Sequence, residues 1–356
     1  MVEFKVEDYF AGSGGAADDA TDCTDALQAA VDAAYAVNGG IIRFPREGIC
    51  RIEGSITKSF FGHEGTLIFT GGAVRFVESG TQRISINTLN FMIWEDIVIL
   101  GSNDEGNEYE ATNSHLYFTS VHQTIFNRVS LFGLAIASTT RGVVFADGHL
   151  MVSNCNISGC SVANSGVFRT EGFGSAHYEN IVAYDYVAYK GESFSKTPFG
   201  LHSWIYAKDS AQTNANGRSV VTVKNCSFDE GASLGVYVED VVSVNLEGTA
   251  NNCGSGNGFH FKDIDKVHVK NTWAGYSGSS PEKKGLILEN VKNTEIDHLT
   301  LANNVRVVEL LGTTKKVSFR DSFLNGSTYP NGIKNDANAL IVIDGVKTRN
   351  GITDYR

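Results

Sequence analysis

Short alternating segments of apolar and polar residues recur along most of the chain. The three clearest segments begin at Gly235, Gly258 and Gly285, and each consists of a strand pattern, a polar corner and a second strand pattern. The three can be superimposed position by position. Their glycines recur at intervals of roughly two dozen positions, a period typical of solenoid proteins, in which each repeat packs on its neighbours.

Fainter copies of the same pattern begin at Gly142, Gly166 and Ala339, so the repeat covers most of the sequence. Helical patterns of about 10–15 residues do not separate these strands, which excludes a doubly wound α/β sheet. Strands of one coil must then stack on the corresponding strands of the next. We therefore predict an all-β fold, a right-handed single-stranded parallel β-helix.

One amphipathic helix pattern lies near the N-terminus, at residues 24–37. Acidic and Thr residues precede it, Ala and Leu residues favour the helix, and Gly39 supplies a left-handed stop. Because the end of a solenoid exposes strand edges and core, we expect this helix to cap the first coil. The prediction is one continuous domain, with the strand and capping helix in residues 1–55 and the β-helix in residues 56–356.

Composition and charge exclude several classes of partner. Acidic residues number 40 and basic residues 29, and no Lys/Arg cluster interrupts this balance, so nucleic acid would be repelled. No run of eighteen apolar residues and no signal-peptide pattern occurs, so neither membrane insertion nor an export signal is expected. The six cysteines form no C-x-x-C pair. We expect free, buried thiols, no metal and no cofactor.

The first fifty residues resemble the opening of the pectate-lyase-like superfamily, as found in phage tailspikes and in the catalytic modules of mannuronan C5-epimerases. The coils that follow match only by pattern. An Asp-Pro-His motif of the epimerase type is absent from the sequence, as are the Asn-Thr-Asp, Gly-His-Gly and Arg-Ile-Lys motifs of polygalacturonases. Of the resemblances considered, the one to phage tailspikes is therefore retained. The matching features are the strand Val6–Phe10, the turn ending at Asp18-Asp19, the helix Ala26–Tyr35, Asn38-Gly39-Gly40 and the strand Ile41–Pro45.

One coil is longer than the others. Asn127, Asn154 and Asn180 follow each other at nearly equal intervals and predict an asparagine ladder at the coil corners, but the step from Asn180 to Asn225 is much longer. The excess lies near residues 187–218, which we expect to form a loop extruded from the β-helix. Insertions on one side of a solenoid commonly form its binding surface.

Aromatic side chains gather in and beside this insertion. Aromatic faces stack on the C–H faces of sugar rings, and nearby polar groups take hydrogen bonds from the hydroxyls. The alternative is that the same rings fold over the coils as a small satellite core. The substrate-binding residues predicted here are Tyr184, Tyr186, His202, Trp204 and Tyr206.

Glycoside hydrolysis needs two carboxyl groups, about 5 Å or about 6.5–9.5 Å apart. Neighbouring coils, about 4.8 Å apart, provide such spacings. The catalytic candidates are Glu171, Asp185, Glu192 and Asp209. For Glu171 a structural role stays open, because it also belongs to a corner column in which short polar side chains close turns. That column contains Ser120, Asp147, Asp240, Asp263, Asn290 and Asp344.

A polysaccharide lyase would use different residues. It needs a base such as Tyr, His or Lys, and a cation or acid that holds the uronate carboxylate. Histidines on strands are more often structural, so His122, His149, His260 and His268 are not candidates. The lyase candidates are His177, Tyr178, Lys190 and His202.

The repeat, the N-terminal resemblance and the missing export signal predict a phage tailspike-like receptor-binding protein. Such a protein binds and depolymerises a bacterial surface polysaccharide as a glycoside hydrolase or a lyase. The resemblance implies a homotrimer on the phage tail, assembled in the host cytoplasm. Two alternatives stay open: a non-catalytic β-helix adhesin or structural tail protein, and a secreted polysaccharide lyase or epimerase.

Overall fold

The chain forms parallel coils that fall into two compact units, with described residues up to Phe173 in unit 1 and from Gly174 onward in unit 2. The computed structural model describes residues 1–60, 65–77, 84–101, 116–133, 135–136, 143–158, 161–162, 166–184, 203–209, 219–229, 234–252, 257–276, 284–303, 307–324, 332–344, 347–348 and 351–352.

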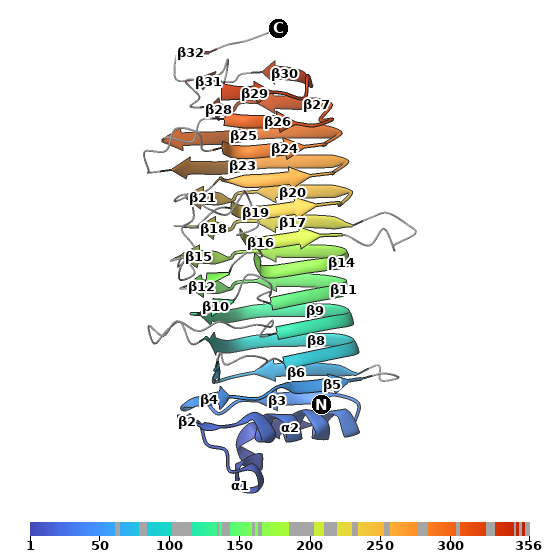
Figure 1. Ribbon diagram of the computed structural model, residues 1–356, viewed down its shortest axis with the longest axis vertical. Helices are drawn as coiled ribbons and strands as arrows, with labels where there is room; N and C mark the ends of the chain where they lie inside the picture. Colours follow the sequence, from blue (N-terminus) through green and yellow to red (C-terminus); the bar gives the residue numbers. More distant parts are fainter. Residues whose placement is uncertain are drawn as a thin grey trace. The chain divides into compact units, whose positions relative to one another are not determined.

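In unit 1, short helical elements precede a stack of parallel strands (Figure 1). The helical elements are η1 (Val6–Tyr9), α1 (Phe10–Ser13) and α2 (Thr24–Ala36). The strands are β1 (Glu3–Lys5), β2 (Asp18–Asp22), β3 (Gly40–Arg43), β4 (Ile49–Ile52), β5 (Ile56–Ser59), β6 (Thr66–Thr70), β7 (Ala73–Phe76), β8 (Ile84–Leu100), β9 (Leu116–Phe132), β10 (Ala135–Ile136), β11 (Val143–Ser153), β12 (Asn156–Ser158), β13 (Ser161–Val162) and the first part of β14 (Gly166–Glu179).

Unit 2 contains the last part of β14 and the remaining strands, which are parallel except for the final pair, β31 and β32. These are β15 (Val182–Tyr184), β16 (Ser203–Lys208), β17 (Val220–Lys224), β18 (Ser227–Phe228), β19 (Leu234–Glu239), β20 (Ser243–Glu247), β21 (Ala250–Asn252), β22 (Phe259–Lys262), β23 (Lys266–Tyr276), β24 (Lys284–Glu289), β25 (Asn293–Asn303), β26 (Val307–Leu311), β27 (Lys316–Arg320), β28 (Phe323–Leu324), β29 (Ile333–Asn335), β30 (Leu340–Asp344), β31 (Lys347–Thr348) and β32 (Gly351–Ile352).

The strand register in unit 2 confirms the predicted repeat. Val220 pairs with Ser243 and Ser243 with Lys266, so two successive coils have the same length. The next pairing, between Lys266 and Asn293, spans a slightly longer coil. The glycines of the aligned segments show the same short and long steps. Residues about two dozen positions apart are therefore direct neighbours, as a parallel β-helix requires.

The predicted capping helix is α2, which lies at the N-terminal end of the coils of unit 1 in Figure 1. The Nζ atom of Lys58 on β5 lies 2.6 Å from the Asp32 carboxylate, and the ring of Phe60 packs edge-on against that of Tyr35 at 5.3 Å. No described helix has the length and apolarity that a membrane crossing requires. The helix buries one apolar face, formed by Ala26, Leu27, Ala30, Val31 and Ala34.

Aromatic side chains fill the interior of the unit 1 coils. Trp94 on β8 is fully buried and stacks on Phe69 of β6, with ring centroids 4.2 Å apart. On its other side, Phe126 of β9 is nearly parallel to it at 5.8 Å. Stacked strands thus place one large ring of each coil over the next, which gives the elongated core its continuity.

The asparagine ladder expected at the coil corners is present in part. Asn154, Asn180 and Asn225 adopt left-handed backbone conformations, with φ between 51° and 54°. In the coil of Asn127 the left-handed residue is instead its neighbour Arg128, although the Asn154 side-chain amide donates to Asn127 Oδ1 at 3.0 Å. Asparagine tolerates this conformation better than other non-glycine residues, which explains its recurrence.

This corner geometry predicts the effect of substituting Asn225, which is exposed and has a φ of 51°. Asn225→Ala should destabilise the protein by about 1 kcal/mol, because alanine is strained in the left-handed region. Asn225→Gly is the matched control and should cost less, since Gly248 occupies the same corner in the next coil at a φ of 58°. Denaturant titrations of both variants test this; equal losses would show that the side chain, not the backbone, matters.

The long coil of unit 2 also follows the sequence analysis, with one correction. Glu179 pairs with Lys224, so this coil is indeed much longer than its neighbours. The expected loop near residues 187–218, however, contains the strand β16, which pairs in parallel with β19. Its sequence Ser-Trp-Ile-Tyr-Ala-Lys alternates like the other coil strands and completes the sheet. The remainder of the predicted loop, residues 187–202 and 210–218, lies outside the described residues.

Candidate functional site

The predicted site residues have contrasting environments. Tyr184 on β15 is 39% exposed and offers a ring to solvent. Trp204 on β16 is fully buried and Tyr206 is 5% exposed, so neither presents an exposed ring of the kind expected of a sugar platform. Five further predicted residues lie outside the described part of the chain and stay predictions: Asp185, Tyr186, Lys190, Glu192 and His202.

In unit 1, Glu171 forms an ion pair with Arg169 from the same strand, β14. The left-handed corner is taken by Gly172, with a φ of 58°. Glu171 therefore stands one residue before the corner. The turn-forming role considered for it belongs to the glycine, and its carboxylate is engaged with an arginine.

In unit 2, alternation along the strands separates an apolar row from a polar row on one sheet. Val236 and Val238 of β19 lie in the fully buried apolar row, together with Phe259 and Phe261 of β22. The intervening positions carry polar and aromatic side chains. Because successive side chains of a strand point to opposite faces, these polar residues share one face. From β16, β19, β22 and β24 they are Tyr206, Lys208, Tyr237, Glu239, His260, Lys262 and Glu289.

Glu239 is the centre of this polar face. Its carboxylate lies 3.0 Å from the Nζ atom of Lys208 and 3.2 Å from that of Lys262, and it accepts a 3.0 Å hydrogen bond from the Tyr237 hydroxyl. The residue is only 8% exposed. Burial opposes its ionisation, but the hydrogen bonds from the two lysines and the tyrosine outweigh this and lower its pKa. Glu239 is thus an ionised carboxylate held in one position.

Three rings stack beside Glu239, one from each of three successive coils. Tyr206 and Tyr237 are nearly parallel with centroids 5.1 Å apart, and His260 packs edge-on against Tyr237 at 5.1 Å. His260 Nε2 lies 3.1 Å from the Glu289 carboxylate. Burial lowers the pKa of His260 despite this carboxylate, and burial raises the pKa of Tyr237. At neutral pH the face therefore contains a neutral imidazole and a protonated phenol.

Asp209 comes directly after β16 and next to this face. Its backbone N–H donates to the Glu239 carbonyl at 3.2 Å, and the residue is 8% exposed. Burial raises the pKa of its carboxyl, as does the charge of Asp240, against a hydrogen bond from Ser219. Among the described residues its Oδ1 atom has no hydrogen-bond partner. Asp209 and Glu239 are thus two carboxyl groups on neighbouring coils whose pKa values move in opposite directions.

Comparison with known proteins identifies the fold. No family model matches the sequence, and no curated protein matches it. Among solved structures, the A-module of mannuronan C-5 epimerase AlgE6 from Azotobacter vinelandii has a TM-score of 0.59 at 12% identity, over 97% of this chain and 99% of that chain. The likeness shows the fold, which is a parallel β-helix. At this identity the likeness concerns the fold, so residue roles are not transferred from that protein.

Two further structures show weaker likeness to this β-helix. The catalytic unit of a GH87 alpha-1,3-glucanase from Streptomyces thermodiastaticus has a TM-score of 0.43 at 12% identity, over 97% of this chain and 68% of that chain. The enzymatically active domain of bacteriophage CBA120 tailspike protein 2 has a TM-score of 0.42 at 12% identity, over 97% and 52% of the two chains. Neither superposition is close enough to support an argument about the site.

Two clusters in unit 2 of the β-helix bring metal-ligand types together. Carboxylate oxygens of Glu239, Asp240 and Asp263 lie within 4.8 Å of one another. The ammonium groups of Lys208 and Lys262 already neutralise this group, at 3.0 Å and 3.2 Å from Glu239. A divalent cation would have to displace both lysines. The cluster therefore fits an ion-pair network better than a metal site.

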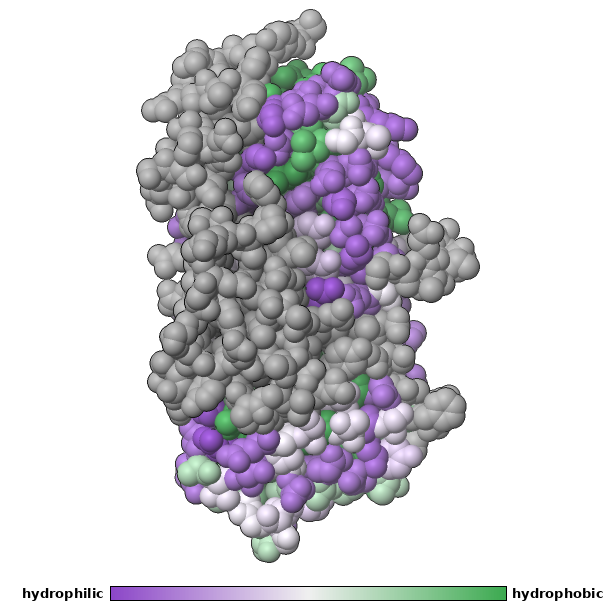
Figure 2. Space-filling model, viewed as in Figure 1, coloured by the Kyte–Doolittle hydropathy of each residue, from purple (hydrophilic) through white to green (hydrophobic). Residues whose placement is uncertain are grey.

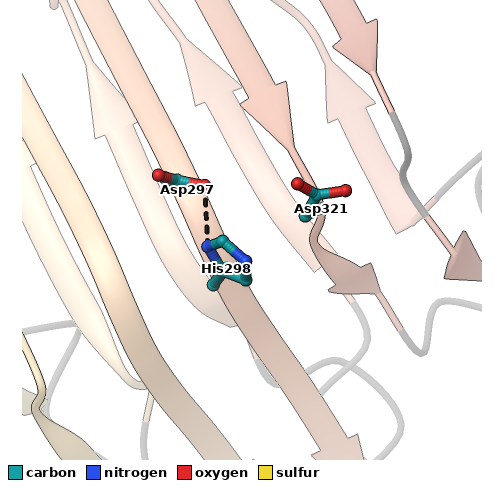
Figure 3. A group of neighbouring side chains, drawn as sticks. All are labelled: Asp297, His298 and Asp321. Atoms are coloured by element: carbon teal, nitrogen blue, oxygen red, sulfur yellow. Dashed lines mark ion pairs between the residues drawn. The ribbon is translucent and has the colours of Figure 1, made fainter.

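The second cluster consists of Asp297, His298 and Asp321 at two neighbouring coil corners (Figure 3). His298 Nδ1 lies 2.7 Å from Asp297 Oδ1, the ion pair drawn in the figure. Imidazole with two carboxylates is a donor set that suits zinc. However, Asp297 lies between Lys270 and Arg320 in the register of the sheet. These two positively charged side chains would repel a zinc ion.

Part of this site was predictable from the sequence, and part was missed. Asp209 and Tyr206 were candidates, whereas Tyr237, Glu239 and Lys262 were not, and His260 was read as structural. A signal was present in the aligned segments, because the second residue after each of Gly235 and Gly258 is a tyrosine or a histidine. The fourth residue after each glycine is charged. Aromatic and charged side chains that recur at the same outward positions of successive coils were the signal for this row.

The raised pKa of Asp209 predicts a pH-dependent stability difference. The folded protein holds this proton more tightly than the unfolded chain, whose carboxyl has a pKa of about 3.9. Stability should therefore fall as pH rises from that value through the raised folded pKa. Asp209→Asn removes this titrating group. As pH rises through this range, the stability of the variant should therefore increase relative to that of the native protein. Denaturant unfolding at a series of pH values tests this, and a constant difference would contradict it.

Proposed function

We propose that this protein binds and cleaves a polysaccharide at the polar face formed by β16, β19 and β22. The observation that supports the proposal is the pair Asp209 and Glu239. Glycosidic cleavage needs one protonated carboxyl group to protonate the leaving oxygen and one ionised carboxylate as nucleophile or base. Environments that move two pKa values apart assign these roles. We assign the proton donor to Asp209, whose pKa is raised, and the nucleophile or base to Glu239, whose pKa is lowered.

Sugar binding next to these carboxyl groups is supported by the residues around them. Partly exposed side chains at the face include Lys208 and Lys262, and the corner residues Asp240 and Asp263 lie beside them; these groups can donate and accept hydrogen bonds with hydroxyls. Elsewhere on the molecule, the described surface visible in Figure 2 is hydrophilic in its upper part and mostly near-neutral at its lower end, with small hydrophobic areas. A hydrated, hydroxyl-rich ligand suits such a surface better than a large apolar partner does.

The finer proposal is a phage tailspike-like depolymerase that recognises a bacterial surface polysaccharide as its receptor. Its support is the N-terminal resemblance, which extends from Val6 to Pro45, together with the β-helix. In this proposal the protein acts as a homotrimer on the phage tail. Sedimentation would test the trimer independently of any activity.

Incubation with capsular polysaccharide and lipopolysaccharide preparations, followed by size-exclusion analysis of the glycan, tests the function. Shortened chains with new reducing ends are expected for a hydrolase. Binding of a glycan without shortening would instead support the adhesin. The absence of both binding and shortening across a broad panel would overturn the proposal. Asp185→Ala and Glu192→Ala extend the test to two candidates outside the described residues: an adhesin would keep its function, and a hydrolase that uses them would lose it.

A second candidate function is proton abstraction from a uronate, as in a lyase or an epimerase. The observation that favours it is the neutral His260, which is oriented by Glu289 at 3.1 Å. A neutral imidazole can accept the proton from the carbon next to a carboxylate. An unsaturated uronate product absorbs in the ultraviolet and would identify a lyase. Incorporation of solvent deuterium into an uncleaved glycan would identify an epimerase.

A further inference from the structure

On the outer face of unit 1, one row of side chains is apolar over five successive coils. Each member lies between two buried residues of its strand and therefore points away from the core. The strand register makes the members direct neighbours, one from each of β3, β6, β8, β9 and β11, which are stacked in Figure 1. Met151 is 40% exposed and the others are partly exposed. We call this row the apolar stripe; it consists of Ile41, Ile68, Ile93, Ile125 and Met151.

The corresponding row of unit 2 is polar. In unit 1, Ile93 lies three residues before Asp96, the left-handed corner residue of its coil. In unit 2, Thr222 lies three residues before the left-handed Asn225, and six successive members of its row are polar before Val342 ends it. Coil geometry therefore accepts polar side chains at this position, and the apolar residues of unit 1 need another explanation. The six polar members are His177, Thr222, Asn245, His268, Glu295 and Ser318.

The apolar stripe carries no charge, and charged groups at its corner edge are paired within the chain. The Arg128 guanidinium lies 2.6 Å from the Asp96 carboxylate and 3.9 Å from that of Glu95. Phe91, two residues before Ile93 on β8, is 38% exposed and widens the apolar area. Soluble proteins rarely leave a contiguous apolar area exposed unless it serves an interaction. An anionic lipid surface is a poor partner, because acidic residues outnumber basic ones by 40 to 29.

A second copy of the same chain is the partner whose spacing matches the apolar stripe. The side chains of the stripe repeat at the coil spacing of about 4.8 Å, and the gaps between them have the same period. Another stripe of identical period can place a side chain in each gap, whereas a helix, which rises about 5.4 Å per turn, falls out of step. A glycan is less suited, because aliphatic side chains offer no hydrogen bonds to its hydroxyls.

We propose that the apolar stripe is the surface through which copies of this chain associate. It is the contact surface of the homotrimer in the proposed function, on which this inference rests. The copies lie side by side with their stripes facing one another, so that each coil of one copy packs against coils of the next. One stripe on each copy suffices, because three straight stripes can meet around a common symmetry axis. The contact uses no residue of the polar face in unit 2.

Sedimentation velocity over a concentration series tests this surface with two charged substitutions. Ile93→Lys and Ile125→Lys, made together, place two ammonium groups in the middle of the apolar stripe, where association would bury them without a partner. We expect the native protein to sediment as a trimer and the double variant as a monomer. The dissociation constant should rise by about 10²-fold or more, the effect of losing two central interface residues. Circular dichroism and melting curves establish that the variant folds.

The matched control is Val98→Lys. Val98 is a β-branched residue of the same strand, β8, but it points outward beyond the corner at Asp96 and so lies on a different face of the coil. This variant should remain a trimer. If the double variant does not fold, Met151→Lys replaces it, because Met151 is the most exposed member of the stripe and tolerates a charge best. It should weaken association by about tenfold or more.

The possible results separate the apolar stripe from the rest of the proposed function. A native protein that stays monomeric across the series would overturn both the stripe and the homotrimer. A trimer that persists in the stripe variants would overturn the stripe alone and leave the homotrimer standing. Dissociation of Val98→Lys as well would overturn the assignment to this face. Glycan cleavage is measured separately on the native protein, so its absence would remove the catalytic proposal and leave the contact surface unaffected.

Discussion

Replacing Glu239 with glutamine is expected to reduce glycan cleavage by about 10²- to 10⁴-fold, the range over which a positioned acid or base contributes. Glutamine keeps the shape of the side chain and removes the charge that Lys208, Lys262 and Tyr237 hold in place. The measurement is the rate of appearance of reducing ends with a glycan that the native protein shortens. Asp209→Asn should cause a loss of similar size, because it removes the proton donor.

The pH profile distinguishes a chemical role from a structural one. A proton donor works only while protonated, so native activity should fall as pH rises through the raised pKa of Asp209. The pH profile of Asp209→Asn should lack this fall in activity. The matched control is Glu247→Gln on β20, which pairs with Lys224 and Lys270 in a different part of the sheet. It should retain full activity. An equal loss of activity in this control, or unchanged activity in Glu239→Gln, would show that the polar face is not the catalytic site.

Replacing Trp94 with alanine is expected to destabilise the fold by about 3–5 kcal/mol, the usual cost of deleting a large buried aromatic side chain. Trp94 is fully buried, and its ring stacks on Phe69 at 4.2 Å and on Phe126 at 5.8 Å. Alanine would leave a cavity between successive coils, which the rings above and below cannot fill without moving their strands. Denaturant unfolding followed by near-ultraviolet circular dichroism measures the loss.

A matched control for this substitution lies three residues earlier on the same strand. Phe91 is 38% exposed, so Phe91→Ala removes an aromatic ring of β8 without opening a closed cavity. It should cost far less than Trp94→Ala. Similar losses for the two variants would mean that the stacked interior of unit 1 does not carry the stability assigned to it. Trp94→Phe, which keeps a ring in the stack, should fall between them.

Much of the architecture was predictable from the sequence, because local rules govern it. Alternating apolar residues define strands, since one face of each strand must be buried. The corners repeat because Asn154, Asn180 and Asn225 tolerate a left-handed backbone that most residues avoid. The capping helix was evident from its composition, although the left-handed residue that follows it is Asn38, with a φ of 61°, and not the predicted Gly39. The register of neighbouring strands could be predicted wherever two coils had similar lengths, as between the segments that begin at Gly235 and Gly258.

The candidate site was decided by the tertiary structure. Tyr206, Tyr237 and His260 are distant in sequence and meet only because three strands align in register. In the long coil, the spacing of the asparagines shows the total length but not how it divides between strand and insertion, so β16 was assigned to a loop. Burial then shifts the pKa of Asp209, and ion pairs shift that of Glu239. Such shifts depend on distances between coils, which a linear pattern of residues does not contain.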